Sequence, residues 1–311
     1  MPRFENWTTL SPEEKGLDEV RLNQMDREIA AKYPNILSAL ILRDGVIVHE
    51  RYYHNNGSND ALPVMSINKS ILSALIGMAI KKGVFHSLDQ LVLDFFRDMD
   101  LSGIDPHVHR LTLRHLLTMT SGFYYTRLAG DAQPIWHRTT NSRNWVEFSL
   151  KLPVRDAMGQ HFNYKNTDAL LAAACLSRAT DKPIGELLEA WLFQPLGIEV
   201  PRSESEDPQR LGIGPVYLPA RDMAKFGHLY LQQGSLGGNQ IIPAEWVKES
   251  TTSHVKNYGY FWWVDPDGYS ASGAGGALIQ VIPKQQTVVV FQSKHLRRFK
   301  DPRDLVRHYV I

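Results

Sequence analysis

The sequence has one cysteine in 311 residues, no long apolar run and almost no surplus of either charge. A single cysteine excludes a scaffold held by internal disulfide bonds. No apolar run reaches the roughly 18 residues that a membrane-spanning helix needs. The formal net charge is +1, from 34 basic and 33 acidic residues, which argues against nucleic acid as the main partner. These absences leave a globular chain, 43% hydrophobic, that can bury a large core without metal or disulfide help.

The single cysteine, Cys175, lies in an apolar stretch with a helical pattern at 170–176. A lone cysteine in such a stretch is usually a small core residue, and a catalytic thiol is the lesser interpretation. The amino-terminal residues 1–7 include no apolar segment of the kind that a secretory signal requires. Together with the single cysteine, this start predicts a cytoplasmic protein.

Strand-like segments near both ends of the chain predict a mixed fold. Residues 37–42 and 46–52 are apolar, β-leaning runs joined by an Asp-Gly turn. Similar runs return at 258–264, 277–282 and 287–292. We therefore predict an α+β fold in which both termini form one antiparallel sheet of about five strands. Helices should flank this sheet, and a mainly helical domain should be inserted into it.

The inserted helical domain is predicted to span residues 64–180, and the sheet domain combines 1–63 with 181–311. The active site is expected at the interface between them. The most distinctive helix, 66–80, is apolar nearly all round beyond Ser70, so it should be central and buried. Further helical patterns lie at 113–119, 166–179, 220–232 and 243–250.

Ser66 and Lys69 form an S-x-x-K tetrad at the start of this helix. Residues three apart share a helix face, so the hydroxyl and the ammonium can meet. A serine becomes a nucleophile when a neighbour takes its proton, which a lysine can do where burial or a cation lowers its pKa. The tetrad alone is weak, because Ser253 with Lys256 matches it in a polar stretch. An N-cap serine beside a solvated lysine is the ordinary structural interpretation.

Tyr164 and Asn166 form a short Y-x-N motif just before the apolar helix at 166–179, for which Asn166 or Thr167 is the expected N-cap. A tyrosine can relay protons, and an asparagine can hold a substrate carbonyl or orient a lysine. Two other matches, beginning at Tyr33 and Tyr53, precede Ser66 in the chain. Alone, the motif is interpreted more simply as a half-buried aromatic with a capping asparagine.

Residues 271–276 read Ala-Ser-Gly-Ala-Gly-Gly and precede the strand predicted at 277–282. Small residues let a substrate approach a strand edge closely. A backbone N–H there could supply one half of an oxyanion hole, with the N–H of Ser66 as the other half. Alone, this segment is interpreted as a glycine-rich bulge or turn.

The order and context of the three motifs resemble the penicillin-recognising serine hydrolases. That family includes serine β-lactamases, DD-peptidases, family VIII esterases and the 6-aminohexanoate-dimer hydrolase group. Three further stretches, at 115–122, 162–166 and 218–227, are similar to the same family, and the resemblance runs from about 37 to 292. It implies a β-lactamase/transpeptidase-like fold with the site between the sheet and the helical domain.

The resemblance also implies a role for each catalytic residue. Ser66 would be the acylated nucleophile and Lys69 its activating partner. Tyr164 would relay the proton and protonate the leaving group. Asn166 would orient the substrate and Lys69.

On the substrate side, the resemblance implies binding by Ser272, Gly273 and Ala274, with the N–H groups of Ser66 and Ala274 as the oxyanion hole. The third motif of β-lactamases and DD-peptidases begins with Lys or His. Here Ala271 stands at that position, or Ser272 if the register shifts by one. Because that cation usually helps hold a substrate carboxylate, its absence favours small neutral esters or amides. A β-lactamase or D-amino-acid peptidase is the alternative.

Other classes of protein fit the sequence less well. An α/β-hydrolase needs a G-x-S-x-G elbow, which is absent. His107, His109 and His115 could serve a metal hydrolase, but no zinc-type motif surrounds them, and surface histidines are the simpler interpretation. We expect no metal or cofactor, and a small-molecule partner rather than nucleic acid or membrane; the oligomeric state is left open. A non-catalytic ligand-binding or scaffold protein is the alternative from another class, against which the intact Ser66 tetrad argues.

Overall fold

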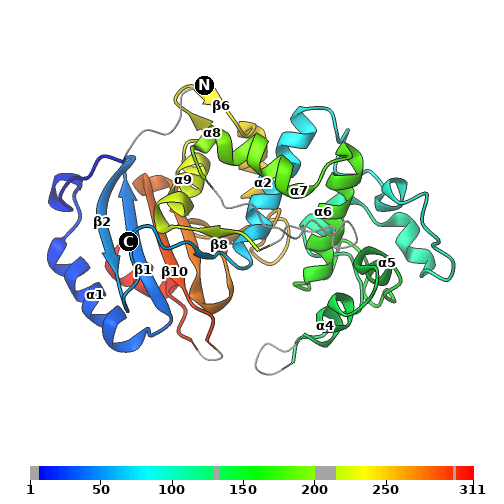
Figure 1. The fold of residues 1–311 in the computed structure, drawn as a ribbon, viewed down its shortest axis with the longest axis horizontal. Coiled ribbons are helices and arrows are strands. Elements are labelled where there is room, and N and C mark those ends of the chain that lie inside the picture. Colours follow the sequence, from blue (N-terminus) through cyan, green and yellow to red (C-terminus); the bar gives the residue numbers. More distant parts are fainter. Residues whose placement is uncertain (1–6, 129–132, 200–214, 297–298) are drawn as a thin grey trace.

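The computed structural model describes residues 7–128, 133–199, 215–296 and 299–311. Its centre is a sheet whose strands lie in the order β2, β1, β10, β9, β8, β7, each antiparallel to its neighbours (Figure 1). The strands are β1 (Ile36–Arg43), β2 (Val46–Tyr52), β7 (Trp263–Asp265), β8 (Gly268–Ser272), β9 (Leu278–Ile282) and β10 (Thr287–Ser293). Two small two-stranded sheets pair β3 (Leu62–Pro63) with β4 (Tyr217–Leu218) and β5 (Ser235–Leu236) with β6 (Asn239–Gln240).

The predicted α+β class, with one antiparallel sheet built from both ends of the chain, is confirmed. The strand prediction at 258–264 is largely wrong, because only its end becomes the short edge strand β7. Strand β8 was not predicted, since its Gly, Ser and Ala residues lack the β-branched pattern of a strand. It forms because Tyr269 to Ser272 pair in register with β9, which would otherwise be an edge.

The helices cover both faces of the sheet and extend beyond it. Their bounds are α1 (Glu19–Lys32), α2 (Ile67–Lys81), α3 (Leu113–Leu117), α4 (Pro134–Thr140), α5 (Trp145–Leu150), α6 (Asn166–Thr180), α7 (Ile184–Leu187), α8 (Gln194–Leu196), α9 (Ala220–Leu231), α10 (Ala244–Ser250) and α11 (Arg303–Tyr309). Short 3-10 turns lie at Glu13–Lys15, Val92–Phe95, Pro106–Arg110, Ala274–Gly276 and Pro283–Gln285, and a π-helical segment spans Leu188–Phe193. Helix α1, capped by the Asp18 carboxylate, was not predicted.

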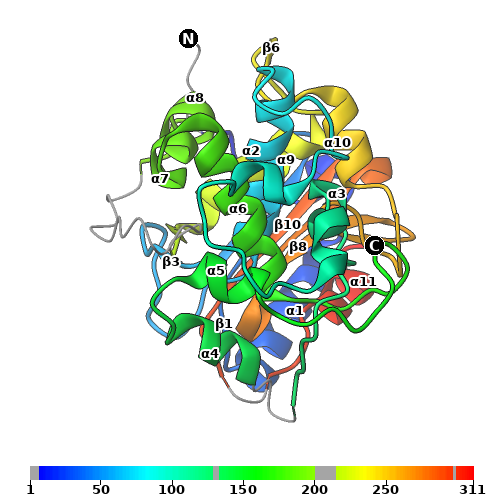
Figure 2. The ribbon, with the colours of Figure 1, turned by 90° about the vertical axis from the view of Figure 1, so that its right-hand side faces the viewer.

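Helix α2 lies between the sheet and the helical region, which Figure 2 shows in front of the sheet. Its residues are buried almost without interruption from Ile67 to Ala79, as the all-round apolar pattern predicted. On this side, α2, α3, α6 and α9 share one apolar core with the sheet. A second core, on the other face of the sheet, packs α1 and α11 against β1 and β10.

The shared core bears on the predicted domain boundaries at 63/64 and 180/181, which stay predictions. Leu40 and Val290 from the sheet belong to the same apolar cluster as Leu75 of α2 and Leu171 of α6. Helix α2 is therefore held from both sides by continuous packing. Within the described part of the chain, no helix is both long and apolar enough to cross a membrane.

Candidate active site

Ser66 immediately precedes α2, and its hydroxyl faces Lys69. The Lys69 Nζ donates to Ser66 Oγ at 3.0 Å, and the lysine is only 8% exposed. Ser66 occupies the N-cap position, but its side chain makes no capping hydrogen bond. The ordinary N-cap interpretation, with a solvated lysine, therefore does not describe this serine. The preceding residue, Met65, has a φ of 53°, a left-handed backbone that few non-glycine residues adopt.

The second S-x-x-K match has none of these properties. Ser253 and Lys256 are both exposed and lie outside any helix. Their side chains therefore lack the burial that would bring a hydroxyl and an ammonium together in a low-dielectric setting. The two matches share a sequence pattern and differ in their surroundings, which only the fold supplies.

Tyr164 lies against the Ser66–Lys69 pair. The Lys69 Nζ is 4.9 Å from the centre of its ring, and the Arg127 guanidinium carbon is 5.4 Å from the same centre. The indole of Trp263 stacks on the ring at 5.8 Å with an interplanar angle of 18°. Cations are attracted to the face of an aromatic ring, so these contacts hold the phenol beside the lysine. Arg127 and Trp263 are site residues that the sequence analysis did not identify.

Asn166 is held by a side chain from the helical region. Its Nδ2 donates to Gln133 Oε1 at 3.0 Å, and the Tyr125 hydroxyl donates to the same oxygen at 2.7 Å. The expectation that Asn166 or Thr167 caps α6 is wrong, because Lys165 is the N-cap and no side chain caps the helix. A cap would accept through the side-chain oxygen, whereas the contact that holds Asn166 is donated by its nitrogen to Gln133, which no local sequence signal could reveal.

The glycine-rich segment lies against the turn that precedes Ser66. A Cβ added to Gly273 would lie 2.7 Å from the Val64 carbonyl oxygen and 3.0 Å from the Met65 Cβ, so only glycine fits there. The Gly273 N–H donates to the Ala277 carbonyl at 2.8 Å. The next N–H along the chain is that of Ala274, the residue named above for the oxyanion hole.

Ala271 and Ser272 end strand β8 beside this turn. Ala271 is fully buried and belongs to the apolar core, whereas Ser272 is half-buried. Neither side chain carries a charge. The structure therefore brings all three sequence motifs to one place, while the roles assigned to their residues remain predictions.

A buried ion pair lies directly behind Tyr164 in the chain. Lys165 Nζ and Asp168 Oδ2 are 3.6 Å apart, both side chains are inaccessible to solvent, and Ser121 Oγ donates to Asp168 Oδ1 at 2.7 Å. Burial raises the pKa of Asp168 to about 6, although the Lys165 charge and the Ser121 hydrogen bond oppose that rise. The pair ties the first turn of α6 to the Tyr164 segment. A charged i, i+3 pair leading into an apolar helix was the available sequence signal.

The histidines considered for a metal site and the single cysteine can now be placed. His107 and His109 are exposed, as predicted, whereas His115 is half-buried. His107 pairs with Asp105 at 2.9 Å, and His115 forms a capping box with Thr112 at the start of α3. Among the residues that the structure describes, no three His, Cys, Asp or Glu side chains gather in a way that could hold a metal ion. Cys175 is fully buried, and burial raises the pKa of its thiol, which agrees with the prediction of a core residue.

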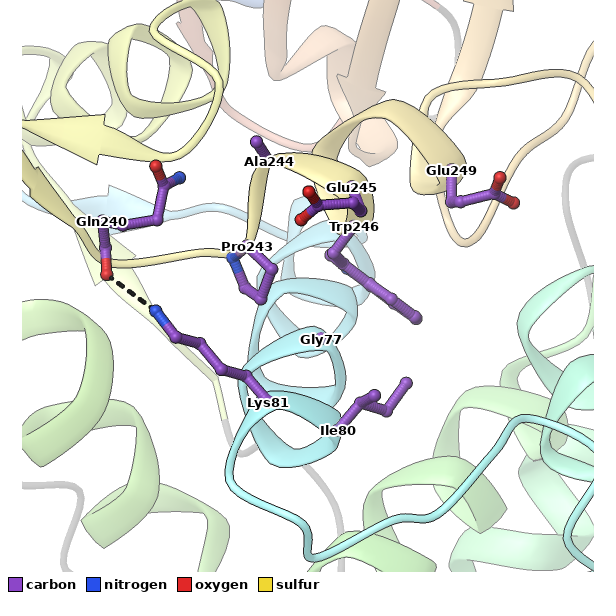
Figure 3. A pocket seen from close by; sticks show the side chains of 9 residues that line it. All are labelled: Gly77, Ile80, Lys81, Gln240, Pro243, Ala244, Glu245, Trp246 and Glu249. Atoms are coloured by element: carbon purple, nitrogen blue, oxygen red, sulfur yellow. Dashed lines mark hydrogen bonds between the residues drawn. The ribbon is translucent and has the colours of Figure 1, made fainter.

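A separate pocket of about 530 Å³ lies at the far end of α2, where it meets α10 (Figure 3). Its lining includes Gly77, Lys81 and Trp246, and the Lys81 Nζ donates to the Gln240 carbonyl at 3.4 Å. Gly77 is eleven residues beyond Ser66, which corresponds to about 16 Å along a helix. This pocket is therefore distinct from the site around Ser66.

Comparison with known proteins agrees with the geometry. A family model described as Beta-lactamase matches residues 31–309. An uncharacterized protein of Alkalihalophilus pseudofirmus is 22% identical over 306 residues, covering 81% of this chain and 82% of that protein. A solved structure from Bacillus anthracis, assigned as a 6-aminohexanoate-dimer hydrolase, has a TM-score of 0.76 at 17% identity, covering 98% of this chain and 86% of that one.

A D-stereospecific amidohydrolase from Streptomyces sp. has a TM-score of 0.70 at 17% identity, covering 94% of this chain and 98% of that one. At such identities the structural likeness shows the fold alone. The match to the family model, by contrast, spans most of the chain, and the matched residues include the positions of all three motifs. The resemblance inferred from those motifs is confirmed, and the chain belongs to the Beta-lactamase family.

Proposed function

We propose that this protein is a serine hydrolase that cleaves small neutral esters or amides through an acyl-enzyme on Ser66. The observation that carries the proposal is the 3.0 Å hydrogen bond between Lys69 Nζ and Ser66 Oγ, made by a lysine that is 8% exposed. A buried partner within hydrogen-bond reach is what a serine hydroxyl needs to become a nucleophile. Membership of a hydrolase family supports the same reaction class.

The proposed reaction has two halves. Ser66 Oγ attacks the substrate carbonyl carbon, and its proton passes to the Lys69–Tyr164 pair. The negative charge that develops on the carbonyl oxygen is stabilised by the main-chain N–H groups of Ser66 and Ala274. Tyr164 then protonates the leaving alcohol or amine, which departs as the acyl-enzyme forms. Water attacks the acyl carbon in the second half, releasing the acid and returning the proton to Ser66.

The preference for neutral substrates is proposed from the end of strand β8. A charge-assisted contact to a substrate carboxylate typically contributes about 1.5–3 kcal/mol, or roughly ten- to a hundredfold in specificity. Ala271 is an uncharged, fully buried methyl at the position where that contact would originate, and Ser272 offers a hydroxyl without charge. A substrate with a neutral group beside the scissile bond loses no binding energy when the cation is missing, whereas a substrate with a carboxylate there loses this contact.

One observation favours a second candidate, a hydrolase of carboxylate-bearing substrates such as β-lactams or D-amino-acid peptides. The Arg127 guanidinium lies 5.4 Å from the Tyr164 ring centre, so a cation does stand near the site. A structurally similar Streptomyces protein is named a D-stereospecific amidohydrolase. Steady-state kinetics on one carboxylate substrate and its methyl ester would distinguish the candidates, because a preference for the carboxylate would favour this second reading.

The test of the main proposal is covalent labelling of the intact protein by a fluorophosphonate. The probe forms a phosphorus–oxygen bond with an activated serine and releases fluoride, which adds a defined mass. We expect the probe to label the wild type and to leave Ser66→Ala unlabelled. Ser253→Ala is the matched control and should label like the wild type, since its serine is exposed and outside any helix. A folded wild type that neither labels nor hydrolyses esters would instead support the non-catalytic alternative.

A further inference from the structure

Three partly exposed aromatic side chains form a continuous surface beside the Ser66–Lys69 pair. Trp263 stacks on Tyr164, and Phe162 meets the Trp263 ring edge-on at 5.9 Å. The buried ring of Tyr258 lies beneath them, 4.8 Å from Trp263 and 5.0 Å from Phe162. We call Phe162, Tyr164 and Trp263 the aromatic wall. Large rings that stay partly exposed although they pack together commonly mark a binding surface.

The backbone explains why this wall stands at the site. Phe162 and Tyr164 are two residues apart in the irregular segment before α6, and both of their rings contact Tyr258 and Trp263. Trp263 opens β7, the edge strand, where it pairs with Ser270 of β8. The other end of β8 reaches the turn before Ser66. The wall therefore joins two segments that are both close to Ser66, one through the contact of Tyr164 with Lys69 and the other through β8 and the turn before Ser66.

The two ends of the aromatic wall differ in the charge of their surroundings. At one end, the Tyr164 ring carries the Lys69 ammonium and the Arg127 guanidinium near its face. At the other end, Trp263 contacts Phe162 and Tyr258, which are aromatic rings without charge. A substrate group that extends from the reacting centre toward Trp263 thus moves from a charged environment into an apolar, flat one.

We propose that Trp263 and Phe162 bind a flat apolar group on the leaving-group side of the substrate, so that Trp263 determines specificity for aromatic alcohols or amines. This inference rests on the proposed function, in which Tyr164 protonates the leaving group. The atoms that receive the proton must lie beside the Tyr164 hydroxyl, and Trp263 is the ring stacked along that phenol. A planar group next to the scissile oxygen or nitrogen would continue this stack.

The experiment compares benzyl acetate with methyl acetate in the wild type, Trp263→Leu and Trp263→Phe. Both esters give the same acetyl-enzyme, so a difference in kcat/KM between them arises in acylation and reports on the leaving group alone. We expect the benzyl-to-methyl ratio of kcat/KM to fall about tenfold in Trp263→Leu, equivalent to about 1.4 kcal/mol. That is the effect of uncovering roughly 55 Å² of apolar surface. Trp263→Phe keeps a ring and should retain most of the ratio.

Trp191→Leu is the matched control, because this half-buried tryptophan lies beside Lys82 in another part of the molecule. Its benzyl-to-methyl ratio should equal that of the wild type. An unchanged ratio in folded Trp263→Leu, or an equal fall in Trp191→Leu, overturns the inference. If the wild type still hydrolyses both esters and Ser66→Ala does not in that case, the proposed function stands while the inference fails. A folded wild type that neither hydrolyses the esters nor reacts with the fluorophosphonate would contradict the proposed function itself.

Discussion

Gly77 in α2 is where the packing of the active-site helix can be tested most directly. A Cβ added to Gly77 would lie 2.2, 2.3 and 2.5 Å from Cγ, Cδ1 and Cδ2 of Trp246 (Figure 3). These atoms belong to a rigid indole on α10, so they cannot move aside as the end of a flexible chain would. Overpacking of this kind costs about 1–3 kcal/mol, and three such contacts favour the upper limit. Alanine favours a helix by about 1 kcal/mol over glycine, so the free energy of unfolding should fall by a net amount of about 2 kcal/mol.

The assay is urea unfolding of Gly77→Ala. It yields the midpoint urea concentration and the slope of the unfolding free energy against urea concentration. Gly185→Ala is the matched control, because the same Cβ at that position in α7 meets nothing within 4 Å. The control should therefore gain about 0.5–1 kcal/mol from lower chain entropy alone. The two substitutions are chemically identical, so opposite signs would isolate the contact with the indole.

A double-mutant cycle completes this test. Trp246→Ala removes the side chain beyond Cβ, and with it the Cγ, Cδ1 and Cδ2 atoms that an alanine at position 77 would touch. In that background, Gly77→Ala should no longer destabilise the protein, and the coupling between the two sites should approach the full cost of the contact. A wild-type-like midpoint for Gly77→Ala alone would refute the reasoning, since it would mean that the helix and α10 separate without cost.

Two further predictions concern the reaction. Tyr164→Phe removes only the hydroxyl, so the fold should be retained while kcat falls by about 10²–10⁴ and one limb of the pH–rate profile shifts or disappears; a wild-type rate and profile would make Tyr164 merely structural. Ser272→Lys, at the half-buried end of β8, should raise kcat/KM for a carboxylate substrate relative to its methyl ester by roughly ten- to a hundredfold. Ser272→Met, which adds similar length without charge, should leave that ratio unchanged. A wild-type preference for the carboxylate, measured on the same pair, would contradict the neutral-substrate proposal and direct attention to Arg127.

Local patterns determined the elements that depend on their own residues. The hairpin of β1 and β2 follows from two apolar runs and an Asp-Gly turn, and its predicted bounds lie within one residue of those observed. Helix α2 was expected at 66–80 and spans Ile67–Lys81, because an apolar pattern on every face can be satisfied only by burial on every side. That Ser66 and Lys69 face each other likewise follows from their three-residue spacing on a helix, which can be read from the sequence.

Elements that depend on a partner could not be predicted in this way. Strand β8 consists of Gly, Ser, Ala and Tyr residues and becomes a strand because β9 supplies its hydrogen-bond partners. Asn166 was expected to cap α6, yet Lys165 is the N-cap, and the Asn166 side chain is held by the hydrogen bond that its Nδ2 donates to Gln133. In both cases a distant segment outweighs the local preference, and that segment is known only once the chain has folded.

The candidate site shows the same division. Its proposed reactive residues were predicted from motif order and from the resemblance of those motifs to a known family. The burial of Lys69 and the stacking of Trp263 on Tyr164 were decided by the tertiary structure alone. Spacing along a helix is fixed by covalent geometry, so the sequence contains it. Burial and ring contacts arise when segments far apart in the chain pack together, so they exist only in the folded molecule.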